Sequence, residues 1–215
     1  VLTDAGAVRE FTASLLEGLR AHVAEVAART GAHVLVQLDE PTLPAVLAGT
    51  LPTASGYGTV PAVGRVEAQD ALRDLVTALE VPVVVHCCAD RPPVRLLAGI
   101  GAAGVGIDAT RPVFHGETAL PAALDALGET WDGGTPLLLG LVPAREPAVR
   151  PQLRDVARPA FDLADRLGFD RSRLGELTVP TPTCGLAGAT PEWARRAMAL
   201  VRDLGQAFVD PPEDW

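Results

Sequence analysis

The chain has 215 residues, of which 48% are hydrophobic and 21% are charged, a composition typical of a soluble globular protein rather than a disordered one. The formal net charge of -9 at pH 7, with no cluster of Lys or Arg, argues against nucleic acid as a partner. Three cysteines are too few for a disulfide-stabilised fold, and no stretch reaches the roughly 18 apolar residues that span a bilayer, so we expect a cytoplasmic protein without membrane contact.

Five short apolar runs alternate with longer amphipathic stretches, a pattern typical of βα units around a parallel sheet. In chain order, the predicted strands are residues 33–38, 81–86, 104–108, 136–142 and 177–181. The predicted helices are residues 7–30, 65–79, 92–98, 117–127, 152–167 and 191–208. Thr190 is the expected N-cap of the last helix, because Pro191 follows it at the first helical position.

This order indicates an α/β fold of the (β/α)8 TIM-barrel type, in which residues 1–215 form a single domain covering about the last five βα units. A closed barrel of eight strands needs about 250 residues, and we therefore expect the first three or so strands to be missing. The exposed strand edge of such a partial barrel predicts self-association, or pairing with the missing N-terminal part. A doubly wound open sheet of five parallel strands remains open as an alternative.

Polar side chains follow the predicted strands, at the edge where parallel α/β folds build their sites. His86 and Cys88 are two residues apart at a strand end, so both side chains face the same way and Cys87 faces the other way. Asp108 ends the next strand, and Cys184 follows the last one. Because zinc accepts imidazole, thiolate and carboxylate ligands in one tetrahedral site, these residues predict a zinc site that activates a small thiol substrate.

Further side chains near this edge have both functional and structural interpretations. The carboxylate of Asp39 is placed to bind the ammonium group of an amino-acid substrate, but an acidic turn before the next helix has the same pattern. Arg111 is a candidate for binding a carboxylate. Each cysteine taken alone is equally well explained as a core residue. The glycines of residues 99–106 lack the GxGxxG spacing of a dinucleotide site.

Four short motifs occur in the order of a known family. They are the strand end Gln-Leu-Asp-Glu-Pro at 37–41, the His86-x-Cys88 pair, the acidic residue at the next strand end, and Thr-Cys-Gly-Leu at 183–186. Together they resemble the C-terminal catalytic barrel of cobalamin-independent methionine synthase. The resemblance runs from about residue 6 to residue 208, and the combination is specific although each motif alone is weak.

The resemblance implies a set of roles for these residues. His86, Cys88 and Cys184 would be zinc ligands, and Asp39 would hold the amino group of homocysteine. The implied reaction is the passage of a methyl group from a folate to zinc-bound homocysteine, which forms methionine.

The sequence departs from the family pattern at three places. Asp108 stands where the family usually has Glu as a zinc ligand, Ala45 stands near the position of an acidic residue that contacts folate, and residues 143–145 contain no proton-donating His. These departures leave the methyl donor open between methyltetrahydrofolate and a methylcorrinoid, as for a short, single-barrel relative. Two other interpretations also stay open: a non-catalytic, metal-stabilised barrel fragment, and an enzyme like the related uroporphyrinogen decarboxylases, which need no zinc.

Overall fold

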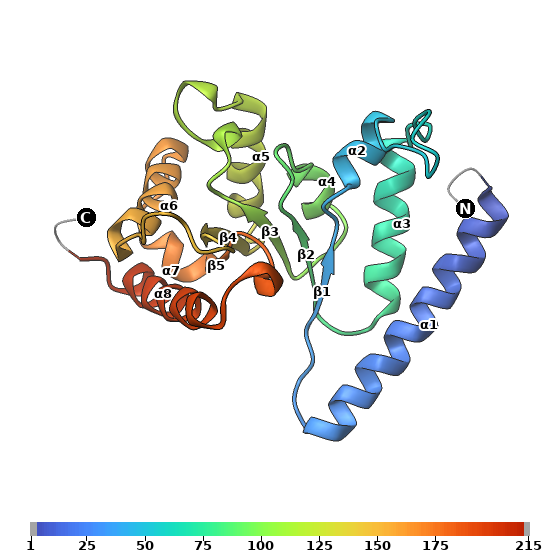
Figure 1. Cartoon of the computed structure of the whole chain (residues 1–215), viewed down its shortest axis with the longest axis horizontal. Coiled ribbons are helices and arrows are strands. Elements are labelled where there is room, and N and C mark those ends of the chain that lie inside the picture. The colour runs from blue at the N-terminus through green and yellow to red at the C-terminus, as the bar shows by residue number, and fades with distance from the viewer. Residues whose placement is uncertain (1–3, 213–215) are drawn as a thin grey trace.

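The computed structural model describes residues 4–212 and contains a five-stranded sheet in which all strands are parallel (Figure 1). The strands are β1 (Val36–Asp39), β2 (Val83–Cys87), β3 (Gly104–Asp108), β4 (Leu137–Val142) and β5 (Thr178–Pro182). All five predicted strands are therefore confirmed, with small shifts at their ends.

The strands lie side by side in chain order, β1-β2-β3-β4-β5. Consecutive units of a (β/α) barrel have this order, whereas a doubly wound sheet reverses its order at a switch point. The structure therefore decides against the doubly wound alternative. In the part of the chain that the structure describes, no strand joins β1 to β5, and the sheet is an open arc.

The helices agree with the prediction except for two short ones that the sequence did not reveal, α2 and α7. The full set is α1 (Ala5–Thr30), α2 (Leu43–Ala48), α3 (Arg65–Ala78), α4 (Val94–Ala98), α5 (Pro121–Asp132), α6 (Leu153–Leu167), α7 (Arg173–Leu177) and α8 (Pro191–Val209). Helix α5 begins later than predicted because Gly116–Thr118 form a 3-10 turn and Pro121 takes the first helical position. Within residues 4–212, no helix is long and apolar enough to cross a membrane.

Side-chain caps explain where the longest helices begin. The Asp4 carboxylate accepts hydrogen bonds from the backbone N–H groups of Gly6 and Ala7 at the start of α1. The hydroxyl of Thr190 accepts from the backbone N–H of Trp193, which confirms the predicted cap of α8. These bonds satisfy N–H groups that have no partner within the helix.

The two faces of the sheet differ in chemistry. Val85, Val105, Ile107 and Leu139 are completely buried within the hydrophobic core, and Cys87 lies in the core with them, as predicted from its position next to Cys88. Because strand side chains alternate between faces, the neighbouring positions point to the opposite face, which carries the polar groups described below.

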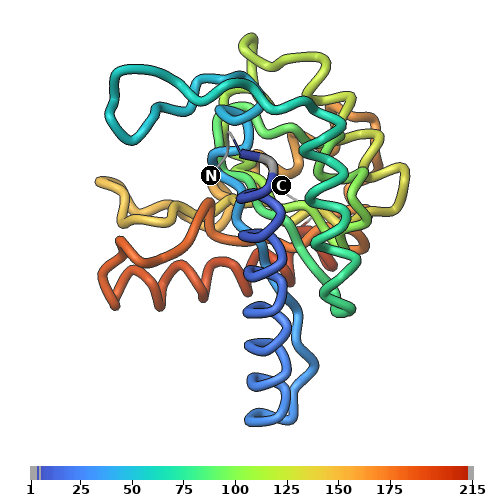
Figure 2. Tube along the Cα trace, turned by 90° about the vertical axis from the view of Figure 1, so that its right-hand side faces the viewer, coloured from blue at the N-terminus to red at the C-terminus, as the bar shows by residue number. Residues whose placement is uncertain are grey.

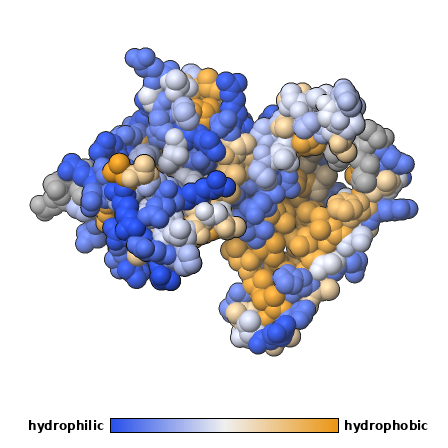
Figure 3. All heavy atoms as spheres, in the orientation of Figure 1, coloured by the Kyte–Doolittle hydropathy of each residue, from blue (hydrophilic) through white to orange (hydrophobic). Residues whose placement is uncertain are grey.

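Helix α1 is set apart from the rest of the molecule. Figure 2 shows it projecting beyond the other elements, and none of its described side chains is buried. An apolar hollow lies between α1 and the segment that leads into β1 (Figure 3). Phe11 and Leu15 on α1 are 61% and 42% exposed, and Leu35 just before β1 is 57% exposed. Leu35 directly precedes β1, the strand at one edge of the described sheet.

Candidate metal and thiol site

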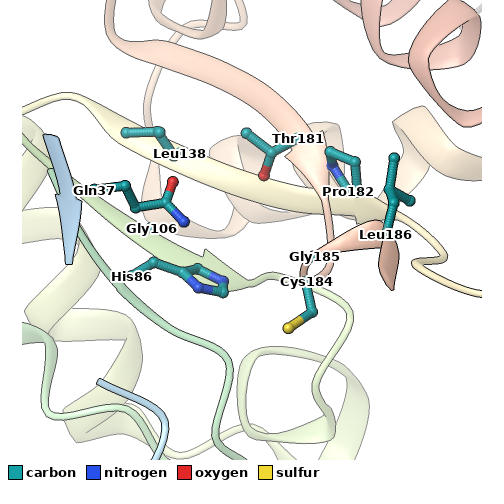
Figure 4. A pocket seen from close by; sticks show the side chains of 9 residues that line it. All are labelled: Gln37, His86, Gly106, Leu138, Thr181, Pro182, Cys184, Gly185 and Leu186. Carbon is teal, nitrogen blue, oxygen red and sulfur yellow. The ribbon is translucent and has the colours of Figure 1, made fainter. Parts of the chain in front are cut away.

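A pocket of about 230 Å³ opens on the polar face of the sheet, toward the carboxyl ends of the strands (Figure 4). Every strand contributes at least one residue to it, directly or just beyond its end. The lining residues are Gln37, His86, Gly106, Leu138, Thr181, Pro182, Cys184, Gly185 and Leu186. Two of the predicted site residues, His86 and Cys184, therefore share one cavity.

A carboxylate holds the His86 ring in place from the neighbouring strand. Asp39 and His86 are paired in the register of β1 and β2, and His86 Nδ1 lies 3.0 Å from Asp39 Oδ1. Because an ionised carboxylate only accepts hydrogen bonds, Nδ1–H is the donor in this pair, and in a neutral imidazole Nε2 then carries the lone pair. This arrangement is the one by which a carboxylate orients a metal-binding histidine.

Gln37 joins the same network and was not among the predicted site residues. Its side-chain amide donates a hydrogen bond to Asp39 Oδ1 at 2.9 Å. Gln37 precedes Asp39 by two residues on β1, so the strand period of two places both on the same face. The two-residue spacing from Asp39 is the sequence feature from which Gln37 could have been predicted as a site residue.

Gly106 makes room for the His86 ring. It lies opposite His86 in the register of β2 and β3. A Cβ atom at Gly106 would lie 3.1 Å from His86 Cδ2 and 3.2 Å from its Cβ, closer than ordinary van der Waals contact. The glycine therefore lets the imidazole lie across β3 toward Cys184, as Figure 4 shows.

Two free thiols meet at the mouth of the site although 96 residues separate them in the sequence. Cys88 Sγ and Cys184 Sγ are 3.6 Å apart, and neither forms a disulfide. Burial, and next the hydrogen bond with Cys184, raise the pKa of Cys88 to about 11. Without a metal, the Cys88 thiol therefore stays protonated at neutral pH.

Asp108 faces the same side of the sheet as His86, but its carboxylate is already engaged. Oδ1 accepts hydrogen bonds from the backbone N–H and the hydroxyl of Thr110, at 3.0 and 2.6 Å. Oδ2 forms an ion pair with Arg111, whose Nε lies 2.8 Å away. Asp108 is 6% exposed. Its predicted role as a fourth zinc ligand stays a prediction.

The loop after β4 lies beside the Cys184 loop. The backbone N–H of Ala144 donates to the hydroxyl of Thr183 at 3.2 Å, and the indole N–H of Trp193 donates to the carbonyl of Pro143 at 2.9 Å. Residues 143–145 therefore lie beside the segment that leads to Cys184. Residues 143–145 are the stretch in which the sequence contains no histidine.

The structure thus brings the predicted residues together in pairs rather than in one cluster. His86 pairs with Asp39, Cys88 pairs with Cys184, and Asp108 pairs with Arg111. Within residues 4–212, no group of three or more His, Cys, Asp and Glu side chains is close enough to hold a metal ion as it stands.

Comparison with known proteins gives one clear family. A family model described as "Cobalamin-independent synthase, Catalytic domain" matches residues 2–207, nearly the whole length of the chain. A search of curated proteins found no match. The matched range includes every residue of the pocket and both thiols.

Proposed function

Because the chain belongs to the cobalamin-independent synthase catalytic-domain family, we propose that it is a zinc-dependent methyltransferase that methylates the sulfur of a small thiol, with homocysteine as the acceptor and methionine as the product. The family indicates methyl transfer to homocysteine in general terms. The ligand set, the acceptor and the barrel of eight strands are parts of the proposal.

The distance between the two thiols is the observation that carries the proposal. Two sulfur ligands of a tetrahedral zinc ion, each at about 2.3 Å from the metal, lie about 3.8 Å apart. Cys88 Sγ and Cys184 Sγ are 3.6 Å apart, so the chain holds the two sulfurs at nearly the separation that zinc requires. A free thiol pair so spaced fits the edge of a zinc tetrahedron without rearrangement of the backbone.

His86 is the third ligand in this proposal. It lines the same pocket as Cys184, and its Nδ1 is engaged by Asp39, which leaves Nε2 for the metal. Zinc, when bound, lowers the pKa of a substrate thiol so that it acts as a nucleophile at neutral pH.

In this proposal, Asp39 binds and orients the acceptor. Asp39 is 63% exposed at its side chain, and only its Oδ1 receives the hydrogen bonds of His86 and Gln37, so Oδ2 is available for a substrate ammonium group. The reaction forms a bond between the acceptor sulfur and the methyl carbon, and breaks the bond between that carbon and its donor. The donor, methyltetrahydrofolate or a methylcorrinoid, stays open because Ala45 and residues 143–145 lack the side chains that a folate donor would need.

The test is zinc content, combined with X-ray absorption of the bound zinc, on the wild type and on Cys88→Ser and Cys184→Ser. We expect about one zinc per chain in the wild type and loss of zinc in both variants, because each removes one of the two sulfurs. Cys87→Ala is the matched control, since Cys87 lies on the opposite face in the core, and it should keep its zinc. Saturating homocysteine should add a sulfur to the zinc coordination shell.

Four results bear against the proposal in different ways. Zinc that is unaffected by both serine substitutions would reject the ligand set. A coordination shell unchanged at saturating homocysteine would reject this acceptor. Bound zinc with no methyl transfer from either donor would favour the non-catalytic fragment, and a zinc-free wild type would favour a decarboxylase-like chemistry on the same fold.

A further inference from the structure

Arg111 connects the ends of two adjacent strands at the edge of the proposed zinc site. One of its terminal nitrogens donates to the carbonyl oxygen of Cys88 at 3.0 Å, and the other lies 2.9 Å from the carboxylate of Asp90. Its Nε lies 2.8 Å from Asp108 Oδ2. A single guanidinium therefore contacts the loop after β2 at two points and the end of β3 at a third.

Cys88 needs such a contact because it lies just beyond the hydrogen-bonded part of β2, which ends at Cys87. A residue outside the ladder is free to change its backbone angles unless another group holds it. Among the described residues, Arg111 supplies the hydrogen bond to the Cys88 carbonyl. The position of the thiol therefore depends on the position of Arg111.

Asp108 in turn holds Arg111, and it does so from a buried position. Its side chain is 8% exposed, whereas that of Arg111 is 37% exposed. Thr110 fixes Oδ1 with two hydrogen bonds, which directs Oδ2 at the guanidinium. To reach a metal, the buried carboxylate would have to give up its ion pair with Arg111 and its hydrogen bonds from Thr110, which is costly.

We propose that Asp108 is a positioning residue and not a zinc ligand: through Arg111 it fixes the backbone of Cys88, and so the separation of the two zinc-binding thiols. This inference rests on the proposed function. The length of the side chain supports it, because Asp has a single methylene group between its backbone and its carboxylate. Its carboxylate therefore stays close to its own strand end, within reach of Thr110 and Arg111.

Zinc affinity distinguishes a positioning role of Asp108 from a ligand role. It is measured by competition with a chelator for Asp108→Asn, Arg111→Gln and the double variant. If Asp108 acts through Arg111, each single variant should weaken zinc binding by about 10-fold to 100-fold, the usual effect of losing an outer-shell partner. The double variant should be no weaker than the single ones, because both substitutions remove the same link. Arg95→Gln is the matched control, since it breaks an equally close ion pair with Glu129 on an exposed surface.

The visible spectrum of the Co(II)-loaded protein gives a second readout, independent of activity. It reports the atoms bound to the metal, so a positioning role predicts the same spectrum for Asp108→Asn and the wild type once both are fully loaded. Arg111→Lys keeps the charge and loses the planar fork, and it should weaken binding by less than Arg111→Gln. It serves as the test if either of the other variants does not fold.

A ligand role for Asp108 predicts the opposite pattern. Arg111 would then compete with zinc for the carboxylate, so Arg111→Gln should leave the affinity unchanged or raise it, and Asp108→Asn should change the cobalt spectrum. Either result in a zinc-binding wild type overturns this inference alone. A wild type that binds neither zinc nor cobalt removes the proposed function, and the inference with it.

Discussion

Glu40, which follows the end of β1, carries a charge that the fold disfavours. It follows Asp39 directly, and burial, together with repulsion from the Asp39 carboxylate, raises its pKa. The folded chain therefore favours the protonated form of Glu40 more than the unfolded chain does. The ionised form reduces stability, and this cost grows as the pH rises through the folded-state pKa.

Substitution of Glu40 by Gln should for this reason stabilise the protein near pH 7. The free energy of unfolding of the variant should exceed that of the wild type at neutral pH, and the two should converge below the ordinary carboxyl pKa of 4.5, where Glu40 is protonated in both states. Denaturant unfolding at several pH values measures this. Glu10→Gln, on the exposed surface of α1, is the control. A gain that persists at low pH would show that charge is not its cause.

At the scale of elements, the close approach of β5 to β4 places Cys184. A Cβ atom at Gly140 of β4 would lie 2.8 Å from the Cα of Thr183 and 2.9 Å from the carbonyl oxygen of Ile107. Both are backbone atoms, so neither can move away by a rotamer change. The chain after β5 can therefore cross β4, and bring Cys184 to Cys88, only because residue 140 has no side chain.

Gly140→Ala should consequently destabilise the protein by about 1–3 kcal/mol, the usual cost of overpacking, and weaken zinc binding by moving Cys184 away from Cys88. Denaturant unfolding and zinc competition measure the two effects. Gly128→Ala is the matched control, because Gly128 lies within α5 and a Cβ there meets only Leu167 Cδ2, at 3.7 Å. The control should be neutral or stabilising. Unchanged zinc affinity in Gly140→Ala would mean that Cys184 is placed by other contacts.

The sequence was sufficient to predict the elements but not how they are arranged. Apolar runs long enough to show a pattern identified all five strands, whereas α2, with six residues including Pro44, is too short to show a helical period. Strand order could not be read from periodicity, because each strand has the same pattern in a barrel and in a doubly wound sheet. The order β1 to β5 is set by tertiary pairing between strands, which the structure shows.

The candidate site was predictable to a similar extent. Strand alternation correctly placed Cys87 in the core and His86 on the opposite face. The sequence indicated only that Cys88 and Cys184 lie at the same edge of the sheet. The 3.6 Å distance between their sulfur atoms depends on the close approach of the chain after β5 to Gly140. The partners of Asp108 depend on the turn at Thr110 and Arg111, for which the sequence has no periodic signal.

At the scale of the whole molecule, the apolar hollow between α1 and the segment that leads into β1 is a surface that another chain could cover. An exposed apolar surface beside a free strand edge favours association. We expect reversible self-association that increases with protein concentration, measurable by sedimentation velocity. Replacing Phe11 and Leu15 by Ser should reduce it, because both are exposed on α1.

Val149→Ser is the matched control for that pair. Val149 is 82% exposed in the loop before α6, and its loss should leave association unchanged. A wild type that sediments as a monomer at every concentration would contradict the prediction of self-association.

Helix α1 and the sheet also differ in burial, and therefore in the local stability that we expect of them. None of the described side chains of α1 is buried, whereas every residue of β3 is buried. The hydrogen bonds from the Arg20 guanidinium to the carbonyl oxygen of Ala78 and the packing of Leu16 and Leu19 on the core hold α1 to the rest of the chain, and we expect its amide protons to exchange faster than those of β3. Hydrogen exchange followed residue by residue would measure this difference, and equal protection of α1 and β3 would contradict it.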